Sequence, residues 1–176
     1  ASAMALLDAL PRRIKDVASF IGYSGQTNSD GSFLAPLSAF IRRGVETELI
    51  KPYVAGEDVR DFAISSDVSS VFPYLSGRLV DVNAYRGALR WLWPNRTTNW
   101  ARATFSKQTY RQEGRTWWEW HQIALKRMWS DFALVYPNVA THNHFAFDRD
   151  GSLCNPHAPF IKLPKEALED DYLALL

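Results

Sequence analysis

Hydrophobic and polar positions follow two different periods along this chain, and together they predict strands in both halves and helices between them. Alternation of apolar with polar residues, rich in β-branched side chains, is typical of half-buried strands. We expect strands where this alternation occurs, at residues 14–21, 32–35, 49–54, 62–65, 132–136, 144–147 and 159–163. Pro73 marks the apolar run 71–74 as a sheet edge, because proline has no N–H for a β-ladder.

A helical spacing replaces the alternation in the middle of the chain. Apolar residues at positions 85, 88, 89 and 92 follow Asp81, which we expect to cap that helix, and Pro94 should end it. Thr116 and Glu119 have the spacing of a capping box before a helix over 117–128. Further helices are predicted at 5–10, 36–43, 98–107 and from residue 163 onward. Strands, then helices, then strands indicate an α+β fold with a mixed sheet in a single domain.

Positive charge is concentrated in one quarter of the chain. Residues 86–127 hold nine basic and two acidic residues, a net of +7, whereas the whole 176-residue chain has a net charge of +1. The same stretch holds six of the seven tryptophans: Trp91, Trp93, Trp100, Trp117, Trp118 and Trp120. Such a segment in a near-neutral protein indicates a polyanionic partner. The alternative is that the tryptophans fill a core and the cations line a solvated face.

Composition limits the class of protein. The chain is 47% hydrophobic and 22% charged, as is typical of a folded domain. Cys154 is the only cysteine, which excludes a disulfide framework and a cysteine-rich metal site and fits a cytoplasmic location. No apolar run in the sequence approaches the ~20 residues of a membrane-spanning helix, and no signal-peptide pattern precedes the domain.

The two ends of the chain indicate that it is part of a longer polypeptide. Residues 1–13 are an N-terminal segment, in which residues 1–3, before Met4, are interpreted as the remnant of a tag. Residues 166–176 have an apolar helical pattern that ends in Leu175 and Leu176 without a cap. Because such a helix normally continues or packs on something, we expect the start of a truncated C-terminal helix. The alternative is a terminal helix that docks on its own domain.

Few residues are spaced as in a catalytic or metal site, and we expect neither kind here. The sequence has no glycine-rich phosphate loop, nucleophile elbow or His-Glu-x-x-His pattern. His142 and His144 would share one face of a strand, where Asp148 or His157 could complete a metal site, although hydrogen-bonded histidines are more common. An acidic run more often caps a short helix than binds a divalent ion, and this run is Glu57, Asp58 and Asp61.

Three segments, in the same order and with similar gaps, resemble the TaqI-like C-terminal specificity domain of adenine-N6 DNA methyltransferases. The first, at 14–33, is a strand followed by a Gly-x-x-Gly-x-Thr loop. The second, IKPYVAGEDVRDF at 50–62, carries the more specific Gly-Glu-Asp motif. The third begins with Arg-Thr-Trp-Trp at 115–118 and continues through 132–137 and 143–151. The match covers most of residues 14–165, and it is most similar to the PglX (BrxX) methyltransferases of BREX phage-defence systems, with type IIG restriction-modification enzymes next.

The resemblance implies a bacterial, cytoplasmic target recognition domain over 14–165 that has no catalytic residues of its own. In this family a separate N-terminal domain binds S-adenosylmethionine and holds the flipped adenine with an Asn-Pro-Pro-Tyr motif. This chain lacks that motif, since Asn155-Pro156-His157-Ala158 has neither the second proline nor the aromatic residue. The implied partners are double-stranded DNA, the methyltransferase domain of the same polypeptide and other defence-system subunits.

Residue chemistry supplies candidates for DNA contacts, because lysine and arginine bind phosphates whereas glutamine and asparagine bind base edges. The phosphate-contact candidates are Lys107, Arg111, Arg115, Lys126 and Arg127. The candidates for base or backbone readout are Gln26, Thr27, Asn28, Gln108 and Gln112. One of two neighbouring tryptophans should stack on DNA or support a loop, namely Trp117 or Trp118. The core tryptophans are expected to be Trp91, Trp93 and Trp100.

Two other functions stay open at this point. A protein-interaction module of a defence complex, or a surface for an anti-restriction inhibitor, would also be rich in tryptophan, tyrosine and arginine. A free-standing metal-dependent nuclease would need a bound divalent ion. Replacing Arg111 and Arg115 separates the first of these from DNA binding, because only a DNA-binding domain should lose affinity for a duplex.

Overall fold

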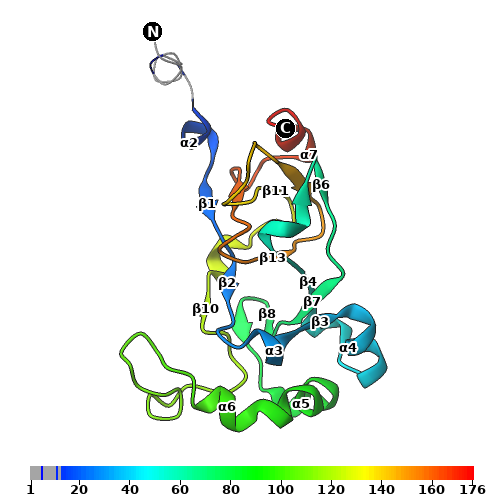
Figure 1. Cartoon of the computed structure of the whole chain (residues 1–176), viewed down its shortest axis with the longest axis vertical. Helices are drawn as coiled ribbons and strands as arrows, with labels where there is room; N and C mark the ends of the chain where they lie inside the picture. Colours follow the sequence, from blue (N-terminus) through cyan, green and yellow to red (C-terminus); the bar gives the residue numbers. More distant parts are fainter. Residues whose placement is uncertain (1–4, 6–10, 12) are drawn as a thin grey trace.

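The computed structural model describes residues 5, 11 and 13–176, and two four-stranded sheets form its frame (Figure 1). The first sheet is antiparallel, in the order β1 (Phe20–Gly22), β14 (Phe160–Lys162), β11 (Ala133–Val135) and β12 (Ala146–Asp148). The second has the order β13 (Leu153–Cys154), β4 (Ile50–Val54), β7 (Val68–Val71) and β3 (Leu34–Pro36). Within it β13 runs parallel to β4, whereas the other neighbours are antiparallel, so the sheet is mixed.

Short ladders and short helices complete an α+β fold, as predicted. The ladders pair β2 (Gly25–Gln26) with β10 (Gln122–Ile123), β5 (Val59–Arg60) with β6 (Ala63–Ile64), and β8 (Tyr74–Leu75) with β9 (Arg78–Leu79). The α-helices are α2 (Ile14–Val17), α3 (Asp30–Phe33), α4 (Leu37–Arg43), α5 (Arg86–Leu92), α6 (Arg96–Trp100) and α7 (Glu169–Leu173). The 3-10 helices are η1 (Thr47–Leu49), η2 (Gly56–Asp58), η3 (Val82–Ala84), η4 (Trp93–Asn95) and η5 (Leu125–Arg127). None of the helices described is long and apolar enough to cross a membrane.

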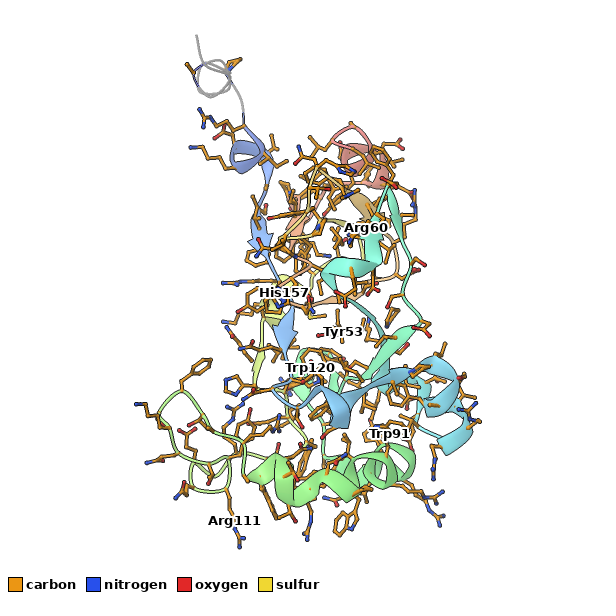
Figure 2. All side chains as sticks on the ribbon, in the orientation of Figure 1. Tyr53, Arg60, Trp91, Arg111, Trp120 and His157 are labelled. Carbon is orange, nitrogen blue, oxygen red and sulfur yellow. The ribbon has the colours of Figure 1, made fainter. Side chains whose placement is uncertain are left out.

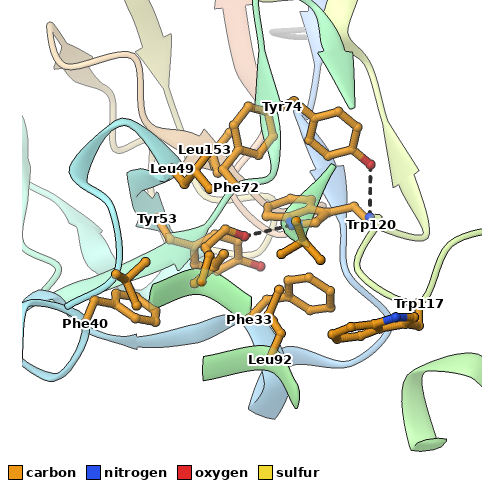
Figure 3. Close-up of a cluster of buried hydrophobic side chains, with 14 residues drawn as sticks. Phe33, Phe40, Leu49, Tyr53, Phe72, Tyr74, Leu92, Trp117, Trp120 and Leu153 are labelled. Carbon is orange, nitrogen blue, oxygen red and sulfur yellow. Dashed lines mark hydrogen bonds between the residues drawn. The ribbon is translucent and has the colours of Figure 1, made fainter. Parts of the chain in front are cut away.

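The largest core lies beside the second sheet and is centred on Trp120 (Figure 3). Trp120 is 1% exposed, and its indole meets the rings of Tyr53 and Phe72 edge to face, at centroid distances of 6.4 and 5.5 Å. Its indole N–H donates to the Val71 carbonyl at 3.2 Å, and its backbone N–H donates to the Tyr74 hydroxyl at 3.0 Å. A buried tryptophan whose indole N–H and backbone N–H are both hydrogen-bonded anchors the cationic stretch to the sheet.

Smaller cores lie against the first sheet, at the end of the molecule opposite α5 and α6 (Figure 1). Val135 and Phe160 are buried on one side of it, and Leu134 and Ile161 belong to a separate cluster with α7. Tyr172 of α7 is 1% exposed, and its hydroxyl accepts the backbone N–H of Leu163 at 3.0 Å. Helix α7 therefore packs on the first sheet through Tyr172, whereas Leu173, Leu175 and Leu176 stay exposed.

Most predicted strands are present, but the first is half wrong. The strands predicted at 49–54, 132–136 and 159–163 are β4, β11 and β14. Residues 14–17 form α2 instead of a strand, because the Asp16 carboxylate accepts the Arg13 backbone N–H at 2.8 Å and closes a helical turn. The helix predicted at 5–10 lies, apart from Ala5, outside the described residues, as does the segment 1–3.

Short-range signals located the turns well. Helix α4 ends at Gly44, which has a left-handed φ of 69°, as the prediction for 36–43 required. The acidic run after β4 forms the predicted cap, since the Asp58 carboxylate accepts the Ala55 backbone N–H at 2.8 Å at the start of η2. Asp81 caps η3 rather than α5, accepting the Asn83 backbone N–H at 3.0 Å.

The predicted helix over 117–128 is wrong, and turns, β10 and η5 take its place. The backbone carbonyls of Trp117 and Glu119 accept hydrogen bonds from Arg102, so they are not available to a helix. The helix predicted over 98–107 likewise ends with α6 at Trp100. Helix α5 ends at Leu92, before Pro94, as predicted. Pro94 itself lies in the first turn of η4, where its missing N–H costs nothing.

Helix α5 is held in place by Glu46, whose carboxylate accepts the backbone N–H groups of Gly87 and Ala88, both at 2.9 Å. Partial burial acts to raise the pKa of Glu46, but these hydrogen bonds outweigh it, and the pKa lies below its usual value. A lowered pKa in the folded state stabilises the fold above the unfolded-state pKa of 4.5, and this contribution is lost as the pH falls through the folded-state value.

We therefore expect Glu46→Gln to lower the free energy of unfolding by about 1 kcal/mol at pH 7, through one lost charge-assisted acceptor. The difference from the wild type should shrink as the pH is lowered below 4.5. Urea unfolding of both proteins at pH 7 and at about pH 3.5 checks this. The control is Glu48→Gln, an exposed position nearby. A wild-type advantage that grows on acidification would contradict the assignment.

Candidate nucleic-acid interface

The residues predicted to contact DNA lie on β2 and the turn after it, on η5, and in residues 101–121, which we call the central loop. These elements follow one side of the molecule, and the central loop extends beyond α6 at the lower left of Figure 1. Lys107, Arg111, Lys126 and Arg127 are exposed, and no ion pair with an acid is present for them in the described part of the chain. The cationic stretch thus keeps free positive charge along this side.

Arg102 is buried at the base of the central loop, with 6% exposure, and organises it. Its guanidinium donates to the carbonyls of Asn99 (3.0 Å), Thr27 (2.6 Å), Trp117 (3.1 Å) and Glu119 (2.8 Å). Burial lowers the pKa of Arg102, but an arginine starts so high that it keeps its charge at neutral pH. One buried cation therefore ties Thr27, in the turn after β2, to both ends of the loop.

Arg115 is also committed within the protein, which argues against its predicted role as a phosphate contact. It forms an ion pair with Glu119, and its Nη2 donates to the carbonyls of Trp120 (3.0 Å) and His121 (3.2 Å). Its guanidinium lies 4.1 Å from the centroid of the Tyr110 ring, on which Arg102 also packs at 4.2 Å. These contacts fix the return of the central loop and leave Arg115 few donors for DNA.

The outer part of the central loop is ordered by its own hydrogen bonds. The hydroxyls of Thr104 and Ser106 both donate to the Glu113 carboxylate, and these bonds hold the pKa of Glu113 below its usual value. The Thr104 backbone N–H donates to the Gln108 carbonyl at 2.7 Å. Lys107 has a left-handed φ of 64° at the turn. Four predicted DNA-contact residues in this outer part of the loop are exposed to solvent: Lys107, Gln108, Arg111 and Gln112.

A two-stranded ladder connects the central loop to the rest of the predicted site. Gln26 of β2 pairs with Gln122 of β10, and the Gln26 amide donates to the Gln122 side-chain oxygen at 3.4 Å. The Tyr23 hydroxyl donates to the same oxygen at 3.3 Å. Ser24, between β1 and β2, is 2% exposed; its backbone N–H donates to the Cys154 carbonyl at 2.9 Å, and its carbonyl accepts the Ala124 N–H at 2.8 Å.

A groove of about 670 Å³ follows this ladder, between the β1–β2 segment and the β10–η5 segment. Tyr23 and Gln122 supply polar groups to its lining, and Lys126 and Arg127 supply positive charge. The Arg127 guanidinium carbon lies 4.3 Å from the centroid of the Phe20 ring, a cation–π contact with another residue of the groove lining. The groove combines hydrogen-bonding amides with cations, as a nucleic-acid contact requires.

Two of the predicted readers and stackers are buried, and a third is half-buried. Thr27 is 0% exposed, its hydroxyl donates to Asp30, and its carbonyl accepts from Arg102. Trp117 is 4% exposed, and Trp118 is half-buried with its indole N–H donating to a backbone carbonyl at 2.9 Å. Both tryptophans support the loop from inside. Asn28 is exposed, with a left-handed φ of 54°.

One predicted core tryptophan is instead at the surface. Trp93 is 51% exposed, because it follows α5 in η4 and faces outward, whereas Trp91 and Trp100 are partly buried as predicted. Arg96 packs over the Trp93 and Trp100 rings at 4.4 and 5.3 Å. The arginines of α5 were not among the predicted DNA contacts. The sequence does carry a signal for them, because Arg86 and Arg90 are four residues apart, opposite the apolar positions of α5, and so form an outward row on the helix.

The histidine pair has an acidic neighbour other than those expected. The buried His144 accepts the Asp61 backbone N–H on Nδ1 at 3.2 Å, and its ring centroid lies 4.0 Å from that of His142. Potential ligand atoms of these three residues lie within 4.8 Å of one another. Asp148 is buried and bonded within its own turn, and burial raises its pKa. Neither it nor His157 is part of this group.

Comparison with known proteins agrees with the resemblance seen in the sequence. No family model matches the chain. Over 157 residues, 89% of this chain, it is 41% identical to "Adenine-specific methyltransferase PglX" from Streptomyces coelicolor, and the match spans 13% of that protein. Among solved structures, the type IIL restriction-modification enzyme MmeI in complex with DNA is similar with a TM-score of 0.60 at 11% identity, covering 95% of this chain and 21% of MmeI. The predicted resemblance is thereby confirmed: the chain is homologous to one segment of a PglX adenine-specific methyltransferase.

Proposed function

We propose that residues 14–165 are the DNA specificity domain of a bacterial adenine-N6 methyltransferase of the phage-defence or restriction-modification type. In this proposal the domain chooses the site, and a separate domain of the same polypeptide, which binds S-adenosylmethionine, methylates it. The observation that supports this most is the 41% identity to a PglX segment, on a fold shared with part of an enzyme whose structure was solved with DNA. The chain lacks the Asn-Pro-Pro-Tyr motif expected of the catalytic part.

The surface chemistry supports the same function. Exposed Lys107, Arg111, Lys126 and Arg127 supply charge for phosphates on one side of the molecule. Exposed amides that can form base-edge hydrogen bonds are those of Asn28, Gln108 and Gln112, together with Gln122 of the groove, and Gln26 is half-buried beside Gln122. Phosphate contacts would set the register of the duplex, and the amides would discriminate between bases.

The test is a fluorescence-anisotropy titration with duplex DNA at several salt concentrations. We expect the wild type to bind with a steep salt dependence, and Lys126→Ala/Arg127→Ala to reduce the slope of log K against log[salt] by about 2. The matched control is Lys165→Ala/Arg149→Ala, which removes two exposed cations that do not line the groove. No binding by the wild type at low salt, or an equal effect of both pairs, would overturn the proposal.

A protein-interaction module is the second candidate, and two exposed aromatic residues favour it. Phe105 on the central loop is 75% exposed and Trp93 is 51% exposed, and large exposed aromatics are common in protein interfaces. Phe105→Ala distinguishes the functions. In a protein-interaction module it would weaken capture of a defence-complex subunit while the DNA titration stayed unchanged.

A further inference from the structure

A narrow notch lies outside the predicted site, where α4 meets α5. The two helices touch through their backbones: a Cβ added at Gly87 would lie 1.7 Å from the Gly44 carbonyl oxygen. This close approach brings Arg43, in the last turn of α4, and Arg90, on α5, to a cavity of about 190 Å³. Its other lining residues are Gly31, Trp91, Pro94 and Asn95. Figure 2 labels Trp91 between the two helices.

The two arginines bring positive charge that the described residues do not neutralise. Both are exposed, and no ion pair or hydrogen bond of either side chain is present in the described part of the chain. The acid nearest in sequence to this junction, Glu46, is occupied by the N–H groups at the start of α5. Arg43 and Arg90 each lie in the last turn of a helix, where a cation complements the helix dipole. The dipole does not require the two side chains to line one cavity, which they do here.

The same face continues as a row of stacked guanidiniums. After α5, Arg96 lies over Trp93 and Trp100, and Arg111 of the central loop lies 5.5 Å from the Trp100 centroid. A guanidinium held flat on an aromatic ring keeps the N–H donors at its edge free for two hydrogen bonds to a phosphate. In Figure 2 Arg111 projects from the lower end of the molecule, on the side of α6 away from the sheets.

We propose that the Arg43–Arg90 notch binds a backbone phosphate of duplex DNA, and that the α5–η4–α6 face is a second, sequence-independent contact surface. This inference rests on the proposed function, because it extends the footprint of the same duplex from the groove around the lower end of the molecule. Two guanidiniums from different helices can grip one phosphate from two directions, and the Asn95 amide lines the same cavity. Such a contact would hold the duplex without reading its sequence.

The experiment compares two charge-matched pairs. Arg43→Gln/Arg90→Gln removes the charge of the notch, whereas Arg42→Gln/Lys165→Gln removes two exposed cations that line neither the notch nor the groove. The salt slope of duplex binding should fall by about 1 for the notch pair, because one phosphate contact is lost, and should stay nearly unchanged for the control pair. The fold loss in affinity should be the same for duplexes of unrelated sequence. Thermal unfolding of each variant verifies the fold.

Three results would overturn the inference. If the wild type binds DNA and the notch pair leaves the slope unchanged, the notch is not a phosphate site, while the proposed function stands. If both pairs reduce the slope equally, the face acts only as diffuse charge. If the wild type does not bind any duplex, the proposed function and this inference fail together, and the α5–η4–α6 face is then a surface for a protein.

Discussion

We expect Arg102→Met to lower the free energy of unfolding by about 3–5 kcal/mol, because it removes a buried charge-assisted hydrogen-bond network. The guanidinium satisfies the carbonyls of Thr27, Asn99, Trp117 and Glu119, and methionine offers none of these donors. Methionine has a similar length, so the effect of lost volume is small. The central loop should also lose its order, and with it the arrangement of Lys107 and Arg111.

Urea unfolding gives the stability, and hydrogen exchange of the amides of residues 101–121 gives the local order. Arg111→Met is the matched control, since Arg111 is exposed and contacts only the Trp100 ring among the interactions described. That substitution should change stability by less than about 1 kcal/mol. Equal destabilisation by both substitutions would show that Arg102 does not organise the loop.

Gly87→Ala is expected to lower the free energy of unfolding by about 3 kcal/mol, because the added methyl group has no space. Its position would be 1.7 Å from the Gly44 carbonyl oxygen and 2.8 Å from the Val45 Cα, which are backbone atoms that cannot rotate away. The helices α4 and α5 must separate, and the hydrogen bonds from Gly87 and Ala88 to Glu46 would lengthen.

Thermal or urea unfolding measures this effect, and Gly31→Ala is the control. Gly31 lies in α3 and has no atom within 4 Å of an added Cβ, so alanine there should be neutral or slightly stabilising. If Gly87→Ala were as harmless as Gly31→Ala, the close contact between α4 and α5 would not exist in solution. The notch between Arg43 and Arg90 would then lose its structural basis as well.

The sequence was sufficient where local signals decide the structure. Alternation with β-branched residues located β4, β11 and β14, and Gly44 located the end of α4, because each depends on neighbours within a few residues. The capping-box spacing of Thr116 and Glu119 did not predict a helix correctly, because contacts from outside that segment decide its structure. Glu119 forms an ion pair with Arg115, and its carbonyl is bound by Arg102, 17 residues away.

The sequence predicts where positive charge is concentrated, but it does not predict which side chains of that stretch are exposed. Lys126, Arg127, Lys107 and Arg111 are exposed, as a cationic surface requires, while Arg102 in the same stretch is buried. The local sequence does not distinguish the buried arginine from the exposed ones. Arg102 is buried because it bonds backbone carbonyls, one of which, at Thr27, is 75 residues away in the sequence. The tryptophans show the same limit. Trp120 packs in the core beside the second sheet and Trp93 is exposed, and the number of tryptophans in the stretch does not predict which of them is buried.

The hydrogen bonds of Ser24 have a consequence for any ligand of the groove. This residue fastens one wall to Cys154 of the second sheet and to Ala124 on the opposite wall. The two walls are therefore already set at a fixed spacing, and little conformational entropy remains to be lost when a ligand arrives. If that ligand is a duplex, base preference would depend on the side chains mounted on a rigid frame, and exchanging them should retune the preference without rebuilding the backbone.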